Sequence, residues 1–244
     1  MRKMLFVFGI LLLFFSCRNA ECSSKVELLE VKSTSQDGEA SQEMIDFLTS
    51  FRTKLSEKMD VRLATSAQTM YSDRPESLLS NLICDVLLKK ANQYQQIDFA
   101  IYNIGGLRSS LPRGDIYLRT IYEILPFDNQ FVFLFLRGED VEQLCQCIAK
   151  VGGEGVAGIS FCIENGIAKD IKVQDIPLDK NRMYCVATND YLSFGNDKME
   201  SLARHINIVY STLKVRDVFI DYITDLESRG EVISSKLDGR IYKK

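Results

Sequence analysis

The chain has 244 residues, of which 46% are apolar and 26% charged, as expected for a globular protein with one sizeable core or two small ones. Its 30 Lys and Arg against 33 Asp and Glu give a formal net charge of −3. This balance provides no strongly basic surface for DNA, RNA or anionic lipid, so nucleic acid is not an expected partner.

The first seventeen residues have the pattern of an export signal. Arg2 and Lys3 precede the apolar stretch 5–15, which fits a signal sequence but is too short for the roughly 20 residues of a membrane-spanning helix. The following Phe14-Phe15-Ser16-Cys17 resembles a bacterial lipobox, in which the cysteine is lipidated and becomes the new N-terminus. We therefore predict a lipoprotein signal peptide over 1–17 with lipidation at Cys17. Ordinary signal-peptidase cleavage and a buried N-terminal helix are the alternatives.

This signal predicts a location outside the cytoplasm. The protein would lie in the bacterial cell envelope, on the periplasmic side or at the cell surface, and would contact the membrane through its lipid only. Residues 18–40 are polar with few large apolar groups, so we predict a flexible tether there and a folded domain over 41–244.

The cysteines beyond Cys17 do not have the spacing of a disulfide framework. Cys84 and Cys145 lie within apolar stripes, where a thiol usually behaves as a small hydrophobic group. Cys145 and Cys147 point to different faces of a predicted helix and lack the paired CxxC or histidine of a zinc site. We therefore expect buried free thiols.

The first half of the folded part predicts helices and strands in alternation. Apolar residues at helical spacing indicate a helix over 41–59, and an extended segment follows over 61–71. Asp73-Arg74-Pro75-Glu76 has the pattern of a helix start, with an acceptor at the cap and Pro in the first turn. The apolar run 98–102 predicts a buried strand that enters a tight loop at Asn103-Ile104-Gly105-Gly106.

The second half continues this alternation. We expect a strand over 115–118, a short helix over 120–125, a strand over 131–136 that is covered on both faces, and a helix after Gly138. Asn165-Gly166 predicts a hairpin between 159–163 and 171–173. Further strands are expected at 183–187 and 206–210, and a last helix over 215–226. The pattern indicates layered sheets covered by helices.

His205 is the only histidine, which argues against a catalytic metal centre. Two-metal hydrolytic sites need several His and carboxylate ligands around ions about 4 Å apart. No EF-hand spacing, GxxxxGK[ST] phosphate loop or nucleophile-elbow motif is present. We expect neither a catalytic nor a metal-binding residue in this chain, and His205 is predicted to be a surface or sheet residue.

Three segments combine polar groups, aromatic rings and turn residues as a binding site would. The segment 103–108 places an amide and a guanidinium around glycines whose backbone a ligand can approach closely. The segment 125–129 presents Phe127 on a loop stiffened by Pro126, and 189–197 carries a second ring six residues before a carboxylate. Taken singly, each also has a structural explanation as a turn, a core aromatic residue or a loop cap.

Five motifs together resemble the C-terminal domain of the 5′-nucleotidase family. In chain order they are Glu76 to Asp85, Asn103 to Arg108, Leu125-Pro126-Phe127, Ala187 to Asp197, and Asp238-Gly239-Arg240-Ile241. The resemblance extends over about 41–242 and rests on the set, since any one motif alone is weak. It implies an α+β fold, a layered α/β/β/α sandwich.

The resemblance also implies the site residues. Phe127 and Tyr191 would lie on either side of a base, and Asn103 would hydrogen-bond the base edge. Asp197 would accept hydrogen bonds from ribose hydroxyls, and Arg108 would bind phosphate oxygens.

The chain departs from the family pattern at three places. Tyr191 stands where the family usually has Phe, which keeps the π-face for stacking. Asp73 stands where the family often has a further substrate arginine, with Arg74 next to it, so phosphate binding would be weaker. The run 194–197 replaces a more Gly-rich one, which could alter the ribose pocket.

In that family, a separate N-terminal metallophosphatase domain carries two metals and cleaves the phosphate ester. Residues 1–40 are too few to contain it. We therefore predict the nucleotide- or nucleoside-recognition half of a split 5′-nucleotidase, a hydrolase of nucleotide catabolism and salvage. The divalent metals would be held by a separate metallophosphatase chain, and this chain would bind no cofactor. The alternatives are a non-catalytic envelope lipoprotein that binds nucleosides or nucleotides for uptake or sensing, and a degenerate domain kept for structural contacts.

Overall fold

The computed structural model describes residues 42–244, so the predicted signal peptide, its lipidation site Cys17 and the tether 18–40 lie outside the described residues. Contacts divide the chain into two units, one ending at Ile45 and one comprising Asp46–Lys244. The sheets and the cores described below belong to the second unit. Among the described residues, no helix has the length and apolar character needed to cross a bilayer.

A five-stranded mixed sheet forms the centre of the second unit. Its spatial order is β10 (Asn207–Lys214), β4 (Gln130–Arg137), β9 (Met183–Asn189), β2 (Phe99–Tyr102) and β5 (Gly155–Ala157). β2 runs parallel to β9, whereas β4 is antiparallel to β9 with Phe131 opposite Asn189. The C-terminal ends of β2 and β9 therefore meet the N-terminal end of β4 at one end of the sheet.

Helices α3 (Leu78–Ala91) and α7 (Val215–Ser228) pack on one face of this sheet. Their apolar side chains form one core with Ala100, Phe131 and Phe133 of the sheet. The ribbon of β1 (Arg62–Ser66) and β3 (Gly114–Tyr117) and the short helix α4 (Leu118–Ile124) contribute Ala64, Ile116 and further residues to the same core.

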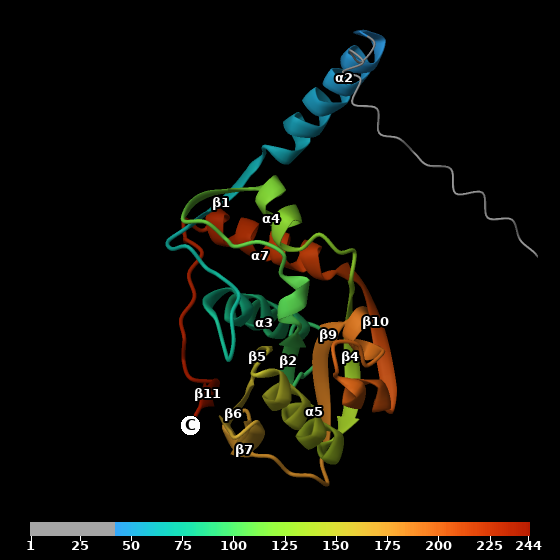
Figure 1. Cartoon of the computed structure of the whole chain (residues 1–244), viewed down its shortest axis with the longest axis vertical. Helices are drawn as coiled ribbons and strands as arrows, with labels where there is room; N and C mark the ends of the chain where they lie inside the picture. The colour runs from blue at the N-terminus through green and yellow to red at the C-terminus, as the bar shows by residue number, and fades with distance from the viewer. Residues whose placement is uncertain (1–41) are drawn as a thin grey trace, which may run out of the picture. The chain divides into compact units, whose positions relative to one another are not determined.

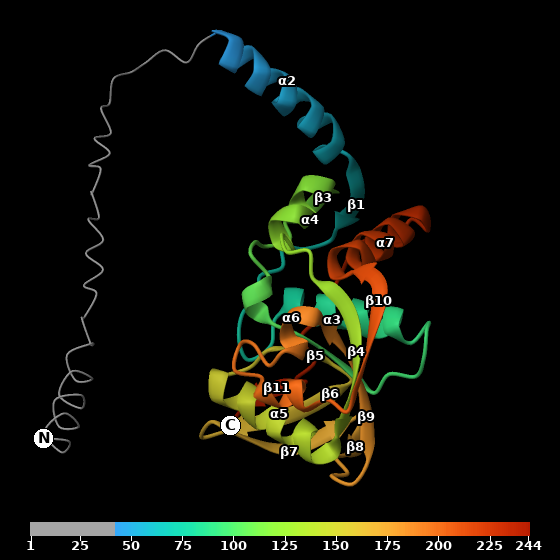
Figure 2. The ribbon, with the colours of Figure 1, turned by 90° about the vertical axis from the view of Figure 1, so that its right-hand side faces the viewer.

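The opposite face of the sheet is covered by α5 (Gly138–Val151) and the 3₁₀ helix η2 (Glu200–Arg204). A second sheet, in the order β11 (Ile241–Lys243), β6 (Ile159–Glu164), β7 (Ile167–Val173) and β8 (Ile176–Pro177), packs against α5. The Gln146 side chain of α5 donates to and accepts from the backbone of Ala168. α5 thus contacts both the central sheet and the second sheet, and the three share one core (Figures 1 and 2).

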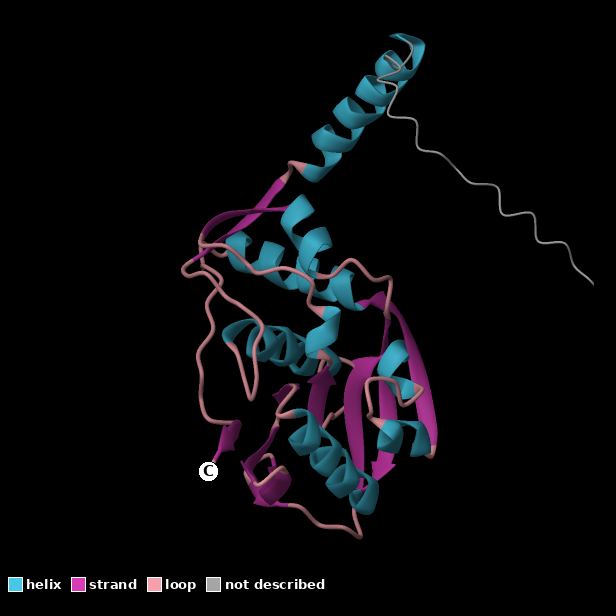
Figure 3. Cartoon of the chain, viewed as in Figure 1, coloured by secondary structure: helices cyan, strands magenta, loops and turns pink. Residues whose placement is uncertain are grey.

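The predicted α+β class is confirmed, as are most of the predicted elements (Figure 3). The strand predicted over 131–136 is β4 and is buried on both faces. The predicted hairpin joins β6 to β7, and both Asn165 and Gly166 have the positive φ that its turn requires. The helix predicted over 41–59 is α2 (Gln42–Met59), whose Phe47, Phe51 and Leu55 are exposed.

The predicted helix start at 73–76 is wrong. Helix α3 begins at Leu78, and Ser77 is its N-cap in a capping box with Ser80. Ser77 Oγ accepts from the Ser80 N–H, and the Ser77 N–H donates to Ser80 Oγ. Serine can replace the usual Glu of a capping box here because its hydroxyl also reaches the cap backbone. Arg74 and Glu76 are therefore free for long-range contacts.

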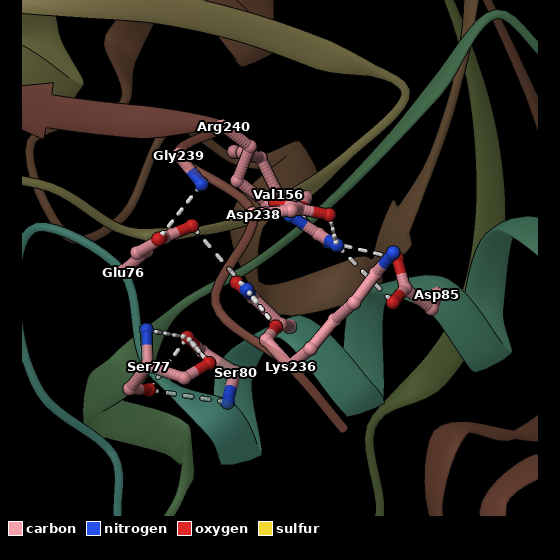
Figure 4. Close-up of polar contacts among 10 residues, drawn as sticks. Glu76, Ser77, Ser80, Asp85, Val156, Lys236, Asp238, Gly239 and Arg240 are labelled. Atoms are coloured by element: carbon pink, nitrogen blue, oxygen red, sulfur yellow. Dashed lines mark hydrogen bonds and ion pairs between the residues drawn. The ribbon is translucent and has the colours of Figure 1, made fainter. Parts of the chain in front are cut away.

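Two of the sequence motifs meet in space as a structural clamp (Figure 4). The Glu76 carboxylate accepts from the Gly239 N–H at 3.0 Å, and Asn81 Nδ2 donates to the Lys236 carbonyl at 3.0 Å. Arg240 pairs with Asp85 and Asp238 and donates to the Val156 carbonyl. These contacts join the first turns of α3 to the chain's C-terminal segment, which then enters β11. Both motifs are therefore structural, and neither lines the site described below.

Replacing Arg240 with alanine is expected to lower the free energy of unfolding by about 1–2 kcal/mol, because a mostly buried guanidinium loses two ion pairs and leaves a carbonyl without its donor. Urea denaturation measures this change. Arg229→Ala is the matched control, since Arg229 also binds two carboxylates but is exposed, and its removal should change stability several-fold less. Equal effects of the two variants would contradict the clamp.

The cysteines and the histidine of this part of the chain agree with the sequence analysis. Cys84, Cys145, Cys147, Cys162 and Cys185 are free and buried. Burial raises the pKa of the Cys185 thiol to about 11, so it stays protonated at neutral pH. His205 follows η2, and its Nδ1 lies 2.9 Å from the Leu202 carbonyl oxygen.

Candidate functional site

The five predicted site residues line one open cavity of about 400 Å³ at the sheet end where β2, β4 and β9 meet. They come from three separate segments of the chain. The cavity lining consists of Asn103, Arg108, Phe127, Tyr191 and Asp197, together with Tyr102, Gly105, Gly106 and Asn129.

Asn103 lies directly after β2 and is buried. Its side-chain amide is hydrogen-bonded to protein groups on two sides. Its Oδ1 accepts from Asn189 Nδ2 at 3.2 Å, and its Nδ2 donates to Asp197 Oδ2 at 2.7 Å. Asn189 ends the neighbouring parallel strand β9, and its own Oδ1 caps α6 (Asp190–Ser193) through the Leu192 N–H. The adjacency of β2 and β9 thus fixes Asn103, and one amide N–H remains for a ligand.

The loop after Asn103 is a 3₁₀ turn, η1 (Ile104–Gly106), that brings backbone close to the Tyr102 ring. A Cβ at Gly106 would lie 2.9 Å from Tyr102 Cε1, closer than side chains tolerate. Arg108 follows this turn at the surface, and its Nη1 donates to the Gly105 carbonyl at 3.2 Å. Among the described residues, no carboxylate forms an ion pair with Arg108, so its guanidinium can bind an anion.

The two aromatic rings of the cavity are accessible to solvent. Phe127 is 49% exposed on the loop between α4 and β4, and Tyr191 is 41% exposed in α6. Asp190 ties these two segments together, since its Oδ1 accepts from the N–H of Gln130 and of Tyr191. Two exposed rings in one cavity leave apolar surface in contact with water, which is unfavourable in the free protein. Such exposed aromatic surface is typical of a site that binds a planar ligand.

Asp197 is the polar centre of the cavity. Its backbone has a φ of 55°, in the left-handed region, which turns the loop after α6 back toward η1. Its Oδ1 accepts from the Tyr191 hydroxyl at 2.9 Å, and its Oδ2 accepts from Asn103. Because a carboxylate offers about four acceptor sites, two remain for hydroxyl groups of a ligand.

The hydrogen bond to Asp197 raises the pKa of the Tyr191 phenol above its ordinary value of 10.0. The phenol should therefore stay protonated at a pH where other exposed tyrosines have ionised. In Asp197→Asn the charge is gone, so the titration midpoint should fall toward 10.0. NMR of ring-labelled tyrosine, assigned with Tyr191→Phe, measures this midpoint. An unchanged midpoint in Asp197→Asn would show that the contact is not formed in solution.

Glu154 holds the backbone of the loop that follows Asn103, and the sequence analysis did not identify it. Its side chain is 3% exposed, and its Oε2 accepts from the Ile104 N–H at 2.6 Å. Its Oε1 forms an ion pair with Arg74, whose Nε donates to the Gly153 carbonyl. Burial raises the Glu154 pKa, opposed by the Ile104 N–H and by Arg74. No local pattern marks Glu154, because its partners lie 50 and 80 positions away.

The described part of the chain offers no group of three or more His, Cys, Asp or Glu side chains placed to hold a metal ion. Within residues 42–244, Asp197 is the one carboxylate that lines the cavity. The donor set of the cavity, which is two amides, a guanidinium, two phenols and one carboxylate, fits a neutral or anionic organic ligand and not a divalent metal.

The chain is similar to known proteins in its sequence. Residues 58–204 match the family model described as the 5′-nucleotidase, C-terminal domain. The chain is 25% identical to Protein UshA of Yersinia enterocolitica and 27% identical to a 5′-nucleotidase of Vibrio parahaemolyticus. These alignments cover 78% and 74% of this chain, but 37% and 33% of the relatives.

A solved structure shows the same fold. The 5′-nucleotidase precursor from Thermus thermophilus superposes with a TM-score of 0.72 at 25% identity, covering 82% of this chain and 42% of that one. The chain thus spans well under half the length of these relatives.

Proposed function

Because the chain belongs to the 5′-nucleotidase family through that family's C-terminal domain, we propose that its cavity binds the nucleoside part of a nucleotide. The observation that carries this proposal is the convergence of Asn103, Arg108, Phe127, Tyr191 and Asp197 on one cavity of about 400 Å³. Each side chain has a distinct task in it.

Phe127 and Tyr191 are placed to stack on a base, which every base permits because each has a π-face. Asp197 accepts from ribose hydroxyls while Tyr191 and Asn103 hold its carboxylate in place. Arg108 neutralises phosphate oxygens. The remaining N–H of Asn103 donates to the base edge, as its position in the motif implies.

In this proposal the chain is the recognition half of a split 5′-nucleotidase, and a separate metallophosphatase chain holds the divalent metals and cleaves the phosphate ester. The donor set of the cavity supports this division, since it suits a substrate and, within the described residues, includes no cluster of metal ligands. The export signal predicted at 1–17, with Cys17 as a lipid anchor, supports a location in the cell envelope.

The binding part of the proposal is tested by calorimetric titration of the full chain with adenosine, guanosine, cytidine and uridine and their 5′-monophosphates. Saturable binding of at least one nucleoside is expected, and no binding would overturn the function.

The split arrangement is tested by AMP hydrolysis with this chain, the candidate metallophosphatase, and both together with divalent metal. Mixing should raise the rate above the sum of the two separate rates. No gain on mixing, in a chain that binds nucleosides, would contradict the split enzyme and favour a binding lipoprotein for uptake or sensing.

A further inference from the structure

Helix α2 carries a row of large apolar side chains that the described part of the chain leaves exposed. Phe47, Leu48, Phe51 and Leu55, which we call the apolar stripe, are between 45% and 61% exposed. The ring centroids of Phe47 and Phe51 are 4.9 Å apart, so the two rings form one aromatic surface. At 100° per residue the stripe covers about 100° of the helix circumference, the width that normally faces an apolar environment. Its exposure therefore indicates a surface that another body covers.

The charged residues of α2 are distributed around the apolar stripe as in a helix that lies on a bilayer. Arg52 and Lys54 border the stripe on its two sides, at about 90° and 70° from its centre, and Lys58 stands in the last turn. Asp46 and Glu57 lie on the opposite side, at about 150° and 130°. Basic residues at the border can reach lipid headgroups while their alkyl stems rest on the apolar layer, and the acidic residues remain in water.

The place of α2 in the chain also favours a membrane. Residues 18–41 separate the predicted lipid anchor Cys17 from the helix. At about 3.5 Å per residue, this segment spans at most roughly 80 Å, so an anchored chain keeps α2 close to the same bilayer. Because the anchor makes the second contact intramolecular, a helix in this place needs only weak affinity of its own for lipid.

The apolar stripe suits a second copy of α2 less well than it suits a bilayer. A coiled coil needs a repeated pair of apolar positions over about three or four heptads, whereas α2 has 18 residues. Phe47 and Leu48 are adjacent, which makes the stripe wider than a two-position seam. Lys58 occupies the position, three residues after Leu55, at which such a seam would continue.

We propose that α2 lies in the surface of the membrane, with the apolar stripe in the outer part of the acyl layer and Arg52 and Lys54 at the headgroups. The partner is thus a lipid surface, and the chain contacts it through a helix in addition to the predicted anchor. The inference rests on the location in the envelope and not on the nucleoside cavity, so nucleoside binding is tested independently of it.

The test uses the fact that the sequence contains no tryptophan, so that Phe51→Trp provides a single indole within the stripe. The full chain, processed as in the cell, is incorporated into vesicles of phosphatidylethanolamine and phosphatidylglycerol whose acyl chains carry bromine. The indole of Phe51→Trp should lose most of its fluorescence relative to vesicles without bromine, because bromine quenches only at close range. Phe194→Trp, which replaces an exposed aromatic residue at the end of α6, should keep its fluorescence.

A pair of double variants in the Phe51→Trp chain identifies the surface responsible. Phe47→Ser/Leu55→Ser removes apolar area from the stripe and should abolish the quenching. Ile167→Ser/Ile176→Ser is the matched control, since it removes two side chains of β7 and β8 that are exposed to a similar degree, and it should leave the quenching intact. Urea denaturation shows that both variants remain folded.

Absence of quenching in Phe51→Trp, equal quenching in Phe194→Trp, or quenching that survives Phe47→Ser/Leu55→Ser would overturn the inference. An emission shift that appears without vesicles and grows with protein concentration would show that a second copy covers the stripe. A shift that appears only when the candidate metallophosphatase is added would assign the stripe to that protein. Either result would also overturn the membrane contact, and none of these outcomes changes the test of nucleoside binding.

Discussion

Replacing Phe127 with alanine is expected to weaken nucleoside binding by about 1–3 kcal/mol, the usual contribution of one aromatic ring stacked on one base. The ring is half exposed in the unliganded protein and stacks on no other ring of the described residues, so its removal should cost binding without cost to the fold. Calorimetric titration with the nucleoside that binds best measures the affinity, and urea denaturation measures the stability.

Phe194→Ala is the matched control for this prediction. Phe194 is also an exposed aromatic residue, at 70%, and it ends the short helix α6 that carries Tyr191, yet it does not line the cavity. Its removal should leave the affinity unchanged. An unaltered affinity in Phe127→Ala would remove Phe127 from the site, and a loss in both variants would point to general damage of this region.

The second large effect is expected for Asp197→Ala. A charge-assisted hydrogen bond contributes about 1.5–3 kcal/mol, and its loss at an exposed site should weaken the binding of a ribonucleoside about tenfold to a hundredfold. The carboxylate already has its orientation in the free protein, because Tyr191 and Asn103 donate to its two oxygens. No ordering of the side chain is then needed when the ligand binds.

The ribose assignment is tested by a pair of ligands. Adenosine and 2′,3′-dideoxyadenosine share the base but differ in both hydroxyls that Asp197 would bind. The wild-type protein should prefer adenosine, and Asp197→Ala should bind the two about equally. If the variant lost the same factor for both ligands, Asp197 would act by holding Tyr191 or Asn103 and not by binding the sugar.

Local sequence patterns predicted most of the regular structure. The strand at 131–136 was visible as an unbroken apolar run, since a strand covered on both faces needs apolar residues at every position. The hairpin could be predicted because its two-residue turn needs positive φ at both positions, and Asn165-Gly166 adopts such a backbone readily. The start of α3 was predicted too early. Ser77 and Ser80 form the capping box of this helix, and in the sequence this pair is a weaker indication of a helix start than Asp73 and Pro75.

Residues that act through distant partners could not be found in this way. Glu154 follows two glycines at the end of α5, a position that is usually a solvated loop, and only the fold brings Ile104 and Arg74 to it. Asn189 looked like the end of a strand, and its bond to Asn103 depends on β2 and β9 being neighbours. The motif at 238–241 resembled the family, but the pairing of Arg240 with Asp85 spans 155 positions.

The sequence by itself therefore determined the α+β class, the family resemblance and the five side chains that we propose bind a nucleoside. These depend on residue types and on short spacings, which one segment displays alone. The tertiary structure decided that the five side chains share one cavity and that the Glu154 carboxylate holds the backbone of Ile104 beside it. These features depend on which strands and loops become neighbours, and that is set by burial of the whole apolar surface in two cores on opposite faces of the sheet.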